Sequence, residues 1–95
     1  MSTEIRIPDH VKPRLPRGVR LKHDEQRDEW LLLAPERIVK ANAIAVEILT
    51  LCDGDATLGE IIDGLTAKFA ADRTRVEIDV RALLGELAAK RMVDL

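Results

Sequence analysis

Aromatic side chains are almost absent from this sequence, which has one Trp, one Phe and no Tyr among its 95 residues. Hydrophobic residues nevertheless make up 46% of the chain, so the core must be built from Leu, Ile, Val and Ala. A chain of this length predicts one domain, near the small end of what folds alone.

Cysteine is scarce too. Cys52 is the only one, which excludes a disulfide framework within the chain and suits a reducing, intracellular setting. It lies on an apolar helical stripe, where a small buried core residue is a much commoner role than a reactive thiol. No apolar run approaches the roughly 20 residues of a bilayer span, and the N-terminus lacks a signal-peptide segment. We therefore expect a cytoplasmic protein without membrane association.

Groups that enzymes use are few and scattered. Ser2 is the only serine, and the two histidines, His10 and His23, lie far from any candidate partner in the sequence. One cysteine and two separated histidines do not make a metal-ligand cluster, and no glycine-rich phosphate loop follows a strand. Four carboxylates gather between residues 24 and 29, but a solvated turn explains them better than an acid/base pair. The sequence predicts no catalytic activity and no cofactor.

Three short runs predict β-strands. Residues 19–23 alternate apolar and polar side chains, residues 30–34 are continuously apolar, and residues 37–41 contain the β-formers Ile38 and Val39. A polar stretch at residues 24–29 and the pair Pro35-Glu36 separate these runs. We expect an antiparallel meander whose third strand is an edge, and whose stability requires helices on one face.

A helical corner follows the strands. Asn42 is a good N-cap for an apolar stripe that extends to Cys52, and Gly54 is expected to close this helix in the left-handed conformation. Thr57 and Glu60 match a capping box for a second helix, which ends near residue 69. Two helices joined by so short a connection must pack at an angle and share a core.

A third helix is expected from the apolar spacing between Val76 and Leu87, with Thr74 and Glu77 as a second capping box. Residues 92–95 form a short tail that suits a strand. The predicted fold is a winged-helix-like α+β domain, with a three-stranded antiparallel β-meander followed by a three-helix bundle. Residues 17–95 form this domain, and residues 1–16 form a flexible, basic, proline-rich arm that contributes little to the core. Within the arm, Ile5 and Ile7 alternate with polar neighbours.

The charge pattern bears on partners. Five basic residues and no acidic one lie between residues 12 and 22, whereas beyond residue 40 six basic against ten acidic residues leave a charge of −4. An alternative function is winged-helix DNA binding with residues 76–90 as the recognition helix. Glu77 and Asp79 would then face phosphates, and no Asn or Gln is available to contact bases, so we expect no nucleic-acid partner.

Peptide binding agrees better with the pattern, because an edge strand beside an apolar groove accepts an added strand. Arg37 and Lys40 also suit a second role, which is to protect that edge from aggregation. The same edge can pair with a second copy of the chain, with Ile5 and Ile7 contributing, so a homo-oligomer is a further option.

Several short pieces of the sequence match the pattern of one known family. They are residues 16–21 (Pro-Arg-Gly-Val-Arg-Leu), residues 32–36 (Leu-Leu-Ala-Pro-Glu), Asn42, residues 48–54 (Ile-Leu-Thr-Leu-Cys-Asp-Gly), Thr57, residues 60–62, Asp79, Val80 and residues 84–87. Through these pieces the sequence resembles the PqqD family over residues 15–93, and the combination of a Pro-Glu pair with a later Cys-Asp-Gly is fairly specific.

The resemblance implies a small, non-catalytic peptide chaperone of pyrroloquinoline quinone biosynthesis. Such a protein would bind the ribosomal precursor peptide PqqA as an added strand and present it to the radical-SAM enzyme PqqE, which crosslinks a Glu to a Tyr of the peptide. Carried over by position, the peptide-binding residues would lie on the edge strand and on one face of the last helix. They are Arg37, Ile38, Val39, Lys40 and Ala41, with Val80, Leu83, Leu84 and Leu87.

Overall fold

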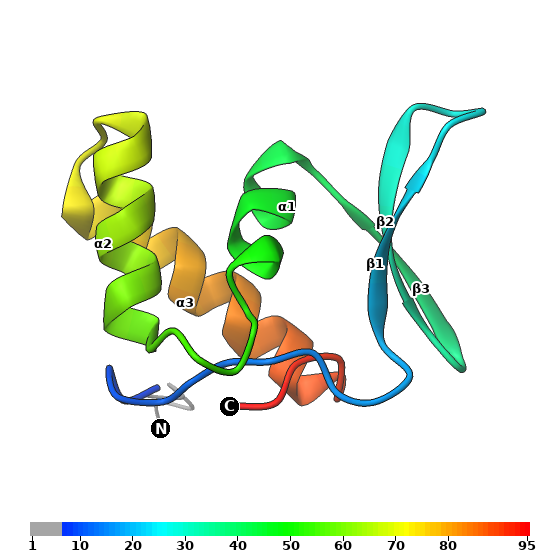
Figure 1. Ribbon diagram of the computed structural model, residues 1–95, viewed down its shortest axis with the longest axis horizontal. Helices are drawn as coiled ribbons and strands as arrows, with labels where there is room; N and C mark the ends of the chain where they lie inside the picture. The colour runs from blue at the N-terminus through cyan, green and yellow to red at the C-terminus, as the bar shows by residue number, and fades with distance from the viewer. Residues whose placement is uncertain (1–6) are drawn as a thin grey trace, which may run out of the picture.

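The structure, a computed structural model, describes residues 7–95. The predicted order of three strands followed by three helices is confirmed (Figure 1). The elements are β1 (Arg20–Asp24), β2 (Glu29–Ala34), β3 (Arg37–Ala41), α1 (Ala43–Thr50), α2 (Leu58–Phe69) and α3 (Arg73–Ala89).

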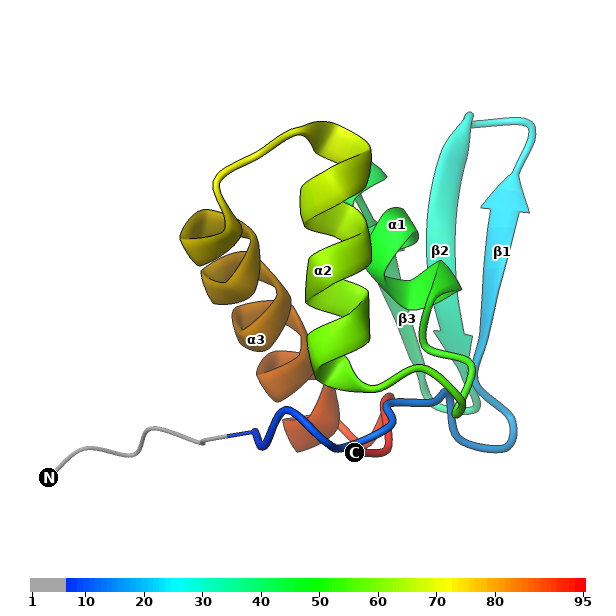
Figure 2. The ribbon, with the colours of Figure 1, turned by 60° about the vertical axis from the view of Figure 1, so that its left-hand side comes forward.

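The strands form one antiparallel meander in the order β1-β2-β3, so β3 is an edge as predicted, and β1 is the other edge. A polar turn joins β1 to β2, and the two-residue turn Pro35-Glu36 joins β2 to β3. The described helices lie on one side of this sheet (Figures 1 and 2).

The caps expected for the first two helices are confirmed. The Asn42 Oδ1 atom accepts a hydrogen bond from the backbone N–H of Ala45 at 2.8 Å. At α2, the Thr57 Oγ1 atom accepts from the N–H of Glu60 at 3.1 Å, and the Glu60 carboxylate accepts from the N–H of Thr57 at 2.8 Å. The same bond from the Thr57 backbone lowers the pKa of Glu60.

The expected end of the first helix is wrong by two residues. The helix α1 stops at Thr50, before Cys52, and Gly54 has a φ of 83° in the turn beyond it. The Asp53 carboxylate accepts hydrogen bonds from the next backbone N–H groups, including that of Ala56 at 3.0 Å. An Asp side chain that bonds its own downstream backbone favours a turn over continued helix, which explains the early stop. The same N–H groups lower the pKa of Asp53.

The second predicted capping box is wrong. Asp72, not Thr74, is the N-cap of α3, and its carboxylate accepts from the Thr74 N–H at 3.4 Å. Glu77 instead pairs with Arg73 and Arg81 along the helix surface. Asp and Thr are both favourable N-cap residues, so residue type alone does not choose between Asp72 and Thr74 as the start of α3. The position at which α2 ends makes that choice.

The N-terminal segment is packed on the helices. Ile7 is only 4% exposed and belongs to the hydrophobic core. The carbonyls of Asp9 and Val11 accept hydrogen bonds from the first N–H groups of α2, those of Gly59 at 3.1 Å and Leu58 at 2.8 Å. Helix N-terminal N–H groups have no partner within the helix, so this segment completes α2. The expectation that residues before Arg17 contribute little to the core is therefore wrong for residues 7–16.

The two ends of the described chain also meet. Arg14 and Asp94 exchange backbone hydrogen bonds of 3.0 and 2.8 Å, and the preceding residues Met92 and Val93 are buried. Figure 2 shows the two segments together beneath the helices. The predicted strand character of the tail is confined to this single bridge. Of the two arm isoleucines, Ile5 lies outside the described residues, and Ile7 is buried where a second copy cannot reach it.

Candidate functional site

The open edge of β3 is the first component of the site. Its two-residue turn pairs Ala34 with Arg37, and the register then continues along both strands. In an antiparallel ladder, hydrogen-bonded and non-hydrogen-bonded pairs alternate, starting from the bonded pair that closes such a turn. The backbone groups of Val39 consequently face β2, and those of Ile38 and Lys40 point away from the sheet.

The side chains of β3 divide between two faces. Val39 and Ala41 lie on the inner face, where they are half-buried and pack against the core, and Arg37 lies exposed on the same face beside the turn. Ile38 and Lys40 are exposed on the opposite face. Ile38 is 69% exposed, an unusual environment for an isoleucine in a strand. The strand thus combines free backbone groups with an uncovered apolar side chain.

The helix residues predicted for the site lie deeper than expected. Val80, Leu84 and Leu87 are 1%, 0% and 2% exposed and belong to the core. Leu83 is half-buried and packs at the margin of that core. A direct contact between the first three side chains and a bound peptide is not available in this conformation.

An open groove of about 650 Å³ begins where β3 ends. Trp30, the only tryptophan, is 39% exposed in its wall. The imidazole of His23 packs on the Trp30 ring, and the two ring centroids are 4.9 Å apart. The Nε2 atom of His23 lies 3.1 Å from a carboxylate oxygen of Asp28. The groove is lined by Asp28, Glu29, Trp30, Lys40, Ala41, Asn42, Ala43, Val46 and Glu47.

This groove was missed from the sequence, where Trp30 was interpreted only as part of an apolar strand. The composition did contain a signal for this groove. The tryptophan lies at the start of a strand, where the side chains of two neighbouring residues are too small to cover so large a ring.

A smaller, apolar cavity of about 140 Å³ lies among the three helices and was also missed. Two exposed apolar side chains stand in its wall, Ile44 at 52% and Phe69 at 47% exposure. Its remaining lining residues are Glu47, Ile48, Leu65, Ala71, Arg75, Val76, Asp79 and Val80, so Val80 is the predicted site residue that borders it.

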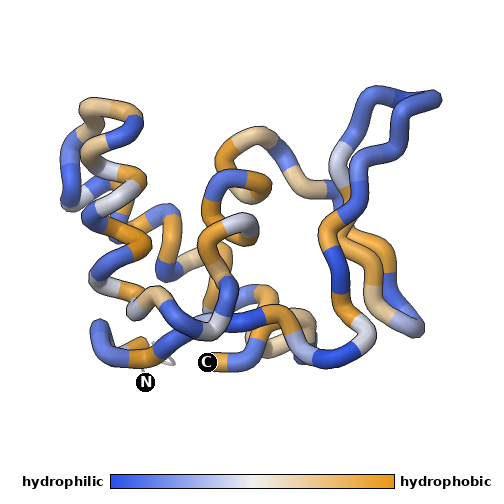
Figure 3. Tube along the Cα trace, viewed as in Figure 1, coloured by the Kyte–Doolittle hydropathy of each residue, from blue (hydrophilic) through white to orange (hydrophobic). Residues whose placement is uncertain are grey.

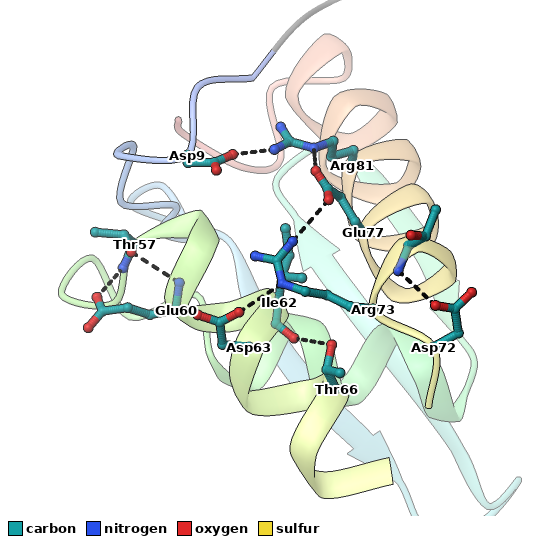
Figure 4. A network of polar contacts seen from close by, with 11 residues as sticks. Asp9, Thr57, Glu60, Ile62, Asp63, Thr66, Asp72, Arg73, Glu77 and Arg81 are labelled. Carbon is teal, nitrogen blue, oxygen red and sulfur yellow. Dashed lines mark hydrogen bonds and ion pairs between the residues drawn. The ribbon is translucent and has the colours of Figure 1, made fainter. Parts of the chain in front are cut away.

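The N-terminal half of α3 is occupied by ion pairs (Figure 4). The Arg73 guanidinium forms ion pairs with two carboxylates, that of Asp63 at an N–O distance of 2.9 Å and that of Glu77 at 3.1 Å. The Arg81 guanidinium pairs with Glu77 at 3.0 Å and also with Asp9. The hydrogen bond to Asp63 raises the pKa of Arg73. These arginines are held by carboxylates of the same domain, which does not suit a helix that must contact DNA phosphates.

Few reactive groups accompany this surface. Among residues 7–95, no group of three or more His, Cys, Asp or Glu side chains is arranged to hold a metal ion. Burial raises the pKa of the Cys52 thiol to about 12, and its Sγ atom donates to the Ile48 carbonyl at 3.3 Å. Within the same residues, none of the helices is both long and apolar enough to cross a membrane. An open strand edge with a groove at its end is suited to binding an extended chain.

The fold and this edge define the class, a small α+β domain with a meander that ends in a free strand. Residues 29–93 match the profile described as Coenzyme PQQ synthesis protein D (PqqD). The chain belongs to the PqqD family.

Similar proteins align with this chain along nearly its full length. The chain is 49% identical over 86 residues to a PqqA binding protein of Rhodopseudomonas palustris (strain CGA009), covering 90% of this chain and 84% of the relative. It is 44% identical over 89 residues to a PqqA binding protein of Xanthomonas euvesicatoria, covering 94% of this chain and 97% of the relative.

Two solved structures share the fold. One is the solution NMR structure of the PqqD truncation of Methylobacterium extorquens PqqCD, described as a functional, stand-alone recognition element for ribosomally synthesized and post-translationally modified peptides. It has a TM-score of 0.75 and 43% identity, covering 87% of this chain and 88% of that one. The other is the crystal structure of PqqD from Xanthomonas campestris, with a TM-score of 0.60 and 39% identity, covering 100% of this chain and 99% of that one.

Proposed function

We propose that this protein is a non-catalytic peptide chaperone of pyrroloquinoline quinone biosynthesis that binds PqqA in the cytoplasm and presents it to PqqE. Membership of the PqqD family supports the pathway, and relatives named PqqA binding proteins support the ligand. The Methylobacterium relative, a recognition element that stands alone, supports a binding role for a domain of this size.

One observation carries the binding mode: β3 is a free edge whose outward backbone groups belong to Ile38 and Lys40. An extended PqqA segment would pair with these groups and become a fourth strand. The exposed side chain of Ile38 would gain an apolar neighbour, and Arg37 and Lys40 would lie beside the backbone of the peptide. All five residues of the edge, Arg37, Ile38, Val39, Lys40 and Ala41, remain in the proposed site.

Beyond the added strand, the peptide would continue into the groove at the Ala41 end of β3. Trp30 offers an exposed indole there, and Val46 supplies apolar surface on α1. The carboxylates of this groove already have partners within the domain, Asp28 in His23, Glu29 in Lys40 and Glu47 in Lys68, so the contact with the peptide there would be mainly apolar.

On the helix side, Leu83 is the predicted residue closest to the surface, and we assign it to the wall facing the peptide. Val80, Leu84 and Leu87 would act indirectly, because they fix the position of α3 from within the core.

The test compares proline with alanine at the outward positions. Lys40→Pro and Ile38→Pro each remove one outward N–H, whereas Lys40→Ala and Ile38→Ala remove only the side chain. We expect the proline variants to stay folded by circular dichroism and to lose the amide NMR shifts that PqqA causes in the labelled protein. The alanine variants should bind within a few-fold of the parent, and Val39→Pro should destabilise the domain by breaking a ladder bond.

Normal PqqA binding by folded Ile38→Pro and Lys40→Pro variants would remove β3 from the proposal. The indole N–H signal of Trp30 gives a separate readout of the groove. It should shift with PqqA in the parent and in both alanine variants.

Presentation to PqqE is tested by the crosslinking reaction, which should accelerate when the protein is added to PqqE and PqqA. The DNA-binding alternative predicts sequence-selective binding that survives added salt. We expect a fluorescence titration with duplex DNA to show at most weak association that disappears as salt rises.

A further inference from the structure

The two residues that flank Trp30 in the sheet differ greatly in size. The register pairs Trp30 with His23 of β1 and with Ala41 of β3, so these three side chains form one row on the inner face. The imidazole of His23 packs on the indole from one side. Ala41 lies on the other side and offers a single methyl group, which cannot cover a ring of that size. Trp30, which is 39% exposed, should therefore be open on its Ala41 side.

The groove at the end of β3 lies on this open side. Trp30 and Ala41 both line it, whereas His23 does not. Lys40 and Ala41 belong to the groove and to β3 alike, so the groove is continuous with the strand edge. Its volume of about 650 Å³ is ample for one large side chain. Figure 3 shows hydrophobic residues recurring along β2, β3 and α1, the elements that border the groove.

A strand added to β3 extends the row of Trp30 and Ala41 by one residue. The outward backbone groups of β3 belong to Ile38 and Lys40, so the added residue opposite Ala41 forms a non-hydrogen-bonded pair with it. Side chains approach each other most closely in such pairs, whose Cα atoms are about 4.5 Å apart. The side chain of this added residue points to the inner face, where it passes over the methyl group of Ala41 towards the indole.

The distance to the indole sets the size of the side chain that can use it. The added strand and β2 are separated by two strand spacings, roughly 10 Å. A short side chain ends above Ala41, whereas a long one, such as leucine, methionine or an aromatic residue, reaches the ring. The carboxylates in the groove have partners within the domain, so they do not favour a basic side chain. An apolar side chain enters without the cost of removing a charge from water.

We propose that the open side of the Trp30 indole receives a long apolar side chain of PqqA, aromatic for the best fit, and that the small size of Ala41 determines this selectivity. The inference rests on the proposed function, because a residue lies opposite Ala41 only when PqqA adds to β3. Aromatic rings pair in offset or edge-to-face arrangements, and with His23 on the other side such a ring would complete a row of three. A larger side chain at position 41 would fill the same space.

The test fills this space from the side of the protein. Ala41→Leu places a branched side chain where the peptide residue would enter, and Ala41→Ser keeps the position small. Ala82→Leu is the control, since it adds the same bulk at an exposed position of α3 that does not line the groove. Isothermal titration calorimetry measures binding of PqqA, and of PqqA peptides in each of which one aromatic or long aliphatic residue is replaced by alanine.

We expect Ala41→Leu to weaken PqqA binding by about tenfold or more, with Ala41→Ser and Ala82→Leu within about twofold of the parent. One of the peptide replacements should weaken binding to the parent by a similar factor and should have little further effect on Ala41→Leu. Such non-additivity indicates that the two side chains compete for one place. Isotope-filtered NOE spectra of the parent complex should then show contacts between that peptide side chain and the indole protons of Trp30.

The NOE spectra decide the matter even where Ala41→Leu does not fold. A complex in which the β3 amides shift but the indole contacts no peptide side chain would overturn the inference and leave the proposed function standing. Parental affinity of a folded Ala41→Leu variant, or contact of the indole with a charged peptide residue, would have the same consequence. Absence of PqqA binding by the parent would overturn both. Parental PqqA affinity of Ala41→Leu with loss of the PqqE reaction would assign the groove to the enzyme and overturn the inference as well.

Discussion

The helical layer and the sheet of this protein differ sharply in how they use apolar side chains. Among the largest side chains that are less than 2% exposed, only Leu32 comes from a strand, and the others come from the helices and from the N- and C-terminal segments packed on them. The sheet instead leaves Trp30 and Ile38 39% and 69% exposed.

This contrast indicates a division of roles. The helices, together with the buried residues Ile7, Pro13, Met92 and Val93 near the two ends, supply most of the burial that stabilises the fold. The sheet is attached to that body through the side chains of its inner face, among them Leu21, Leu32 and Val39, so its edge and outer face are free for partners. Mutations should therefore separate stability from binding according to the layer in which they lie.

The largest expected effect is on the helical side. Leu84→Ala should lower the free energy of unfolding by about 2–5 kcal/mol, because the side chain is fully buried. The matched change Leu33→Ala, on the sheet face that the helices leave uncovered, should cost roughly 1 kcal/mol or less. Urea denaturation followed by circular dichroism measures both, and equal losses would break the proposed division between layers.

Deleting residues 1–12 should cost about 2–4 kcal/mol, since it exposes the site of Ile7 and removes the carbonyls that accept from the first N–H groups of α2. Arg81 also loses Asp9 as its partner. Deleting residues 1–6 alone is the control, because it leaves these contacts in place. An unchanged unfolding midpoint for the longer deletion would show that this segment does not belong with the helical layer.

Stability should fall in alkaline solution because Cys52 must remain protonated in the folded state. Its pKa is raised from 9.0 to about 12 by burial, so the unfolded thiol ionises first. The contribution is complete below pH 9 and is lost as the pH rises towards 12. Guanidinium midpoints between pH 7 and 11 measure the slope, and no tyrosine ionises to obscure it.

The matched variant for that experiment is Cys52→Ala, which should show a shallower loss of stability over the same pH range. A thiol reagent at pH 8 should label the folded parent only at the rate of its unfolding. Immediate labelling would mean that Cys52 is accessible and that this part of the core is open.

Asn42→Ala removes the side-chain cap at the junction between β3 and α1. We expect a loss of about 1 kcal/mol in urea denaturation, since one N–H of the first helical turn becomes unpaired. Asn42→Asp retains an acceptor and should restore most of the loss. A failure of Asp to rescue stability would assign the effect of Asn42 to packing in the groove rather than to capping.

The smallest expected effect is a gain. A Cβ atom at Gly85 would meet nothing within 4 Å, so Gly85→Ala should stabilise α3 by up to about 1 kcal/mol. Thermal melts measure this gain, and binding of PqqA should be unchanged. Loss of binding by the stabilised variant would place a partner backbone against α3 at this position.

Much of the fold was predictable because it depends on neighbouring residues. The strand runs, the Asn42 cap and the Thr57–Glu60 capping box are patterns within a few positions, and all of them are confirmed. The order of the elements also predicted that β3 lies at an edge. Two short turns leave the last strand of a meander with one neighbour.

The site was predictable only in part. The edge strand followed from chain order, but its groove combines Trp30 of β2 with Glu47 of α1, which are distant in the sequence. Helical spacing correctly grouped Val80, Leu84 and Leu87 on one face of α3. It did not show that this face is covered by the core, because periodicity identifies a face without identifying what packs on it.

The sequence by itself determined the types and order of the elements and the free edge, since local backbone preferences and short turns decide these. The tertiary structure alone decided that residues 7–16 complete α2 and that β2 stays uncovered on its outer side. The proline-rich segment has no periodicity, and its carbonyls find partners only when a folded helix presents unpaired N–H groups. An apolar strand likewise has two possible faces, and only the packed domain selects which one the helices cover.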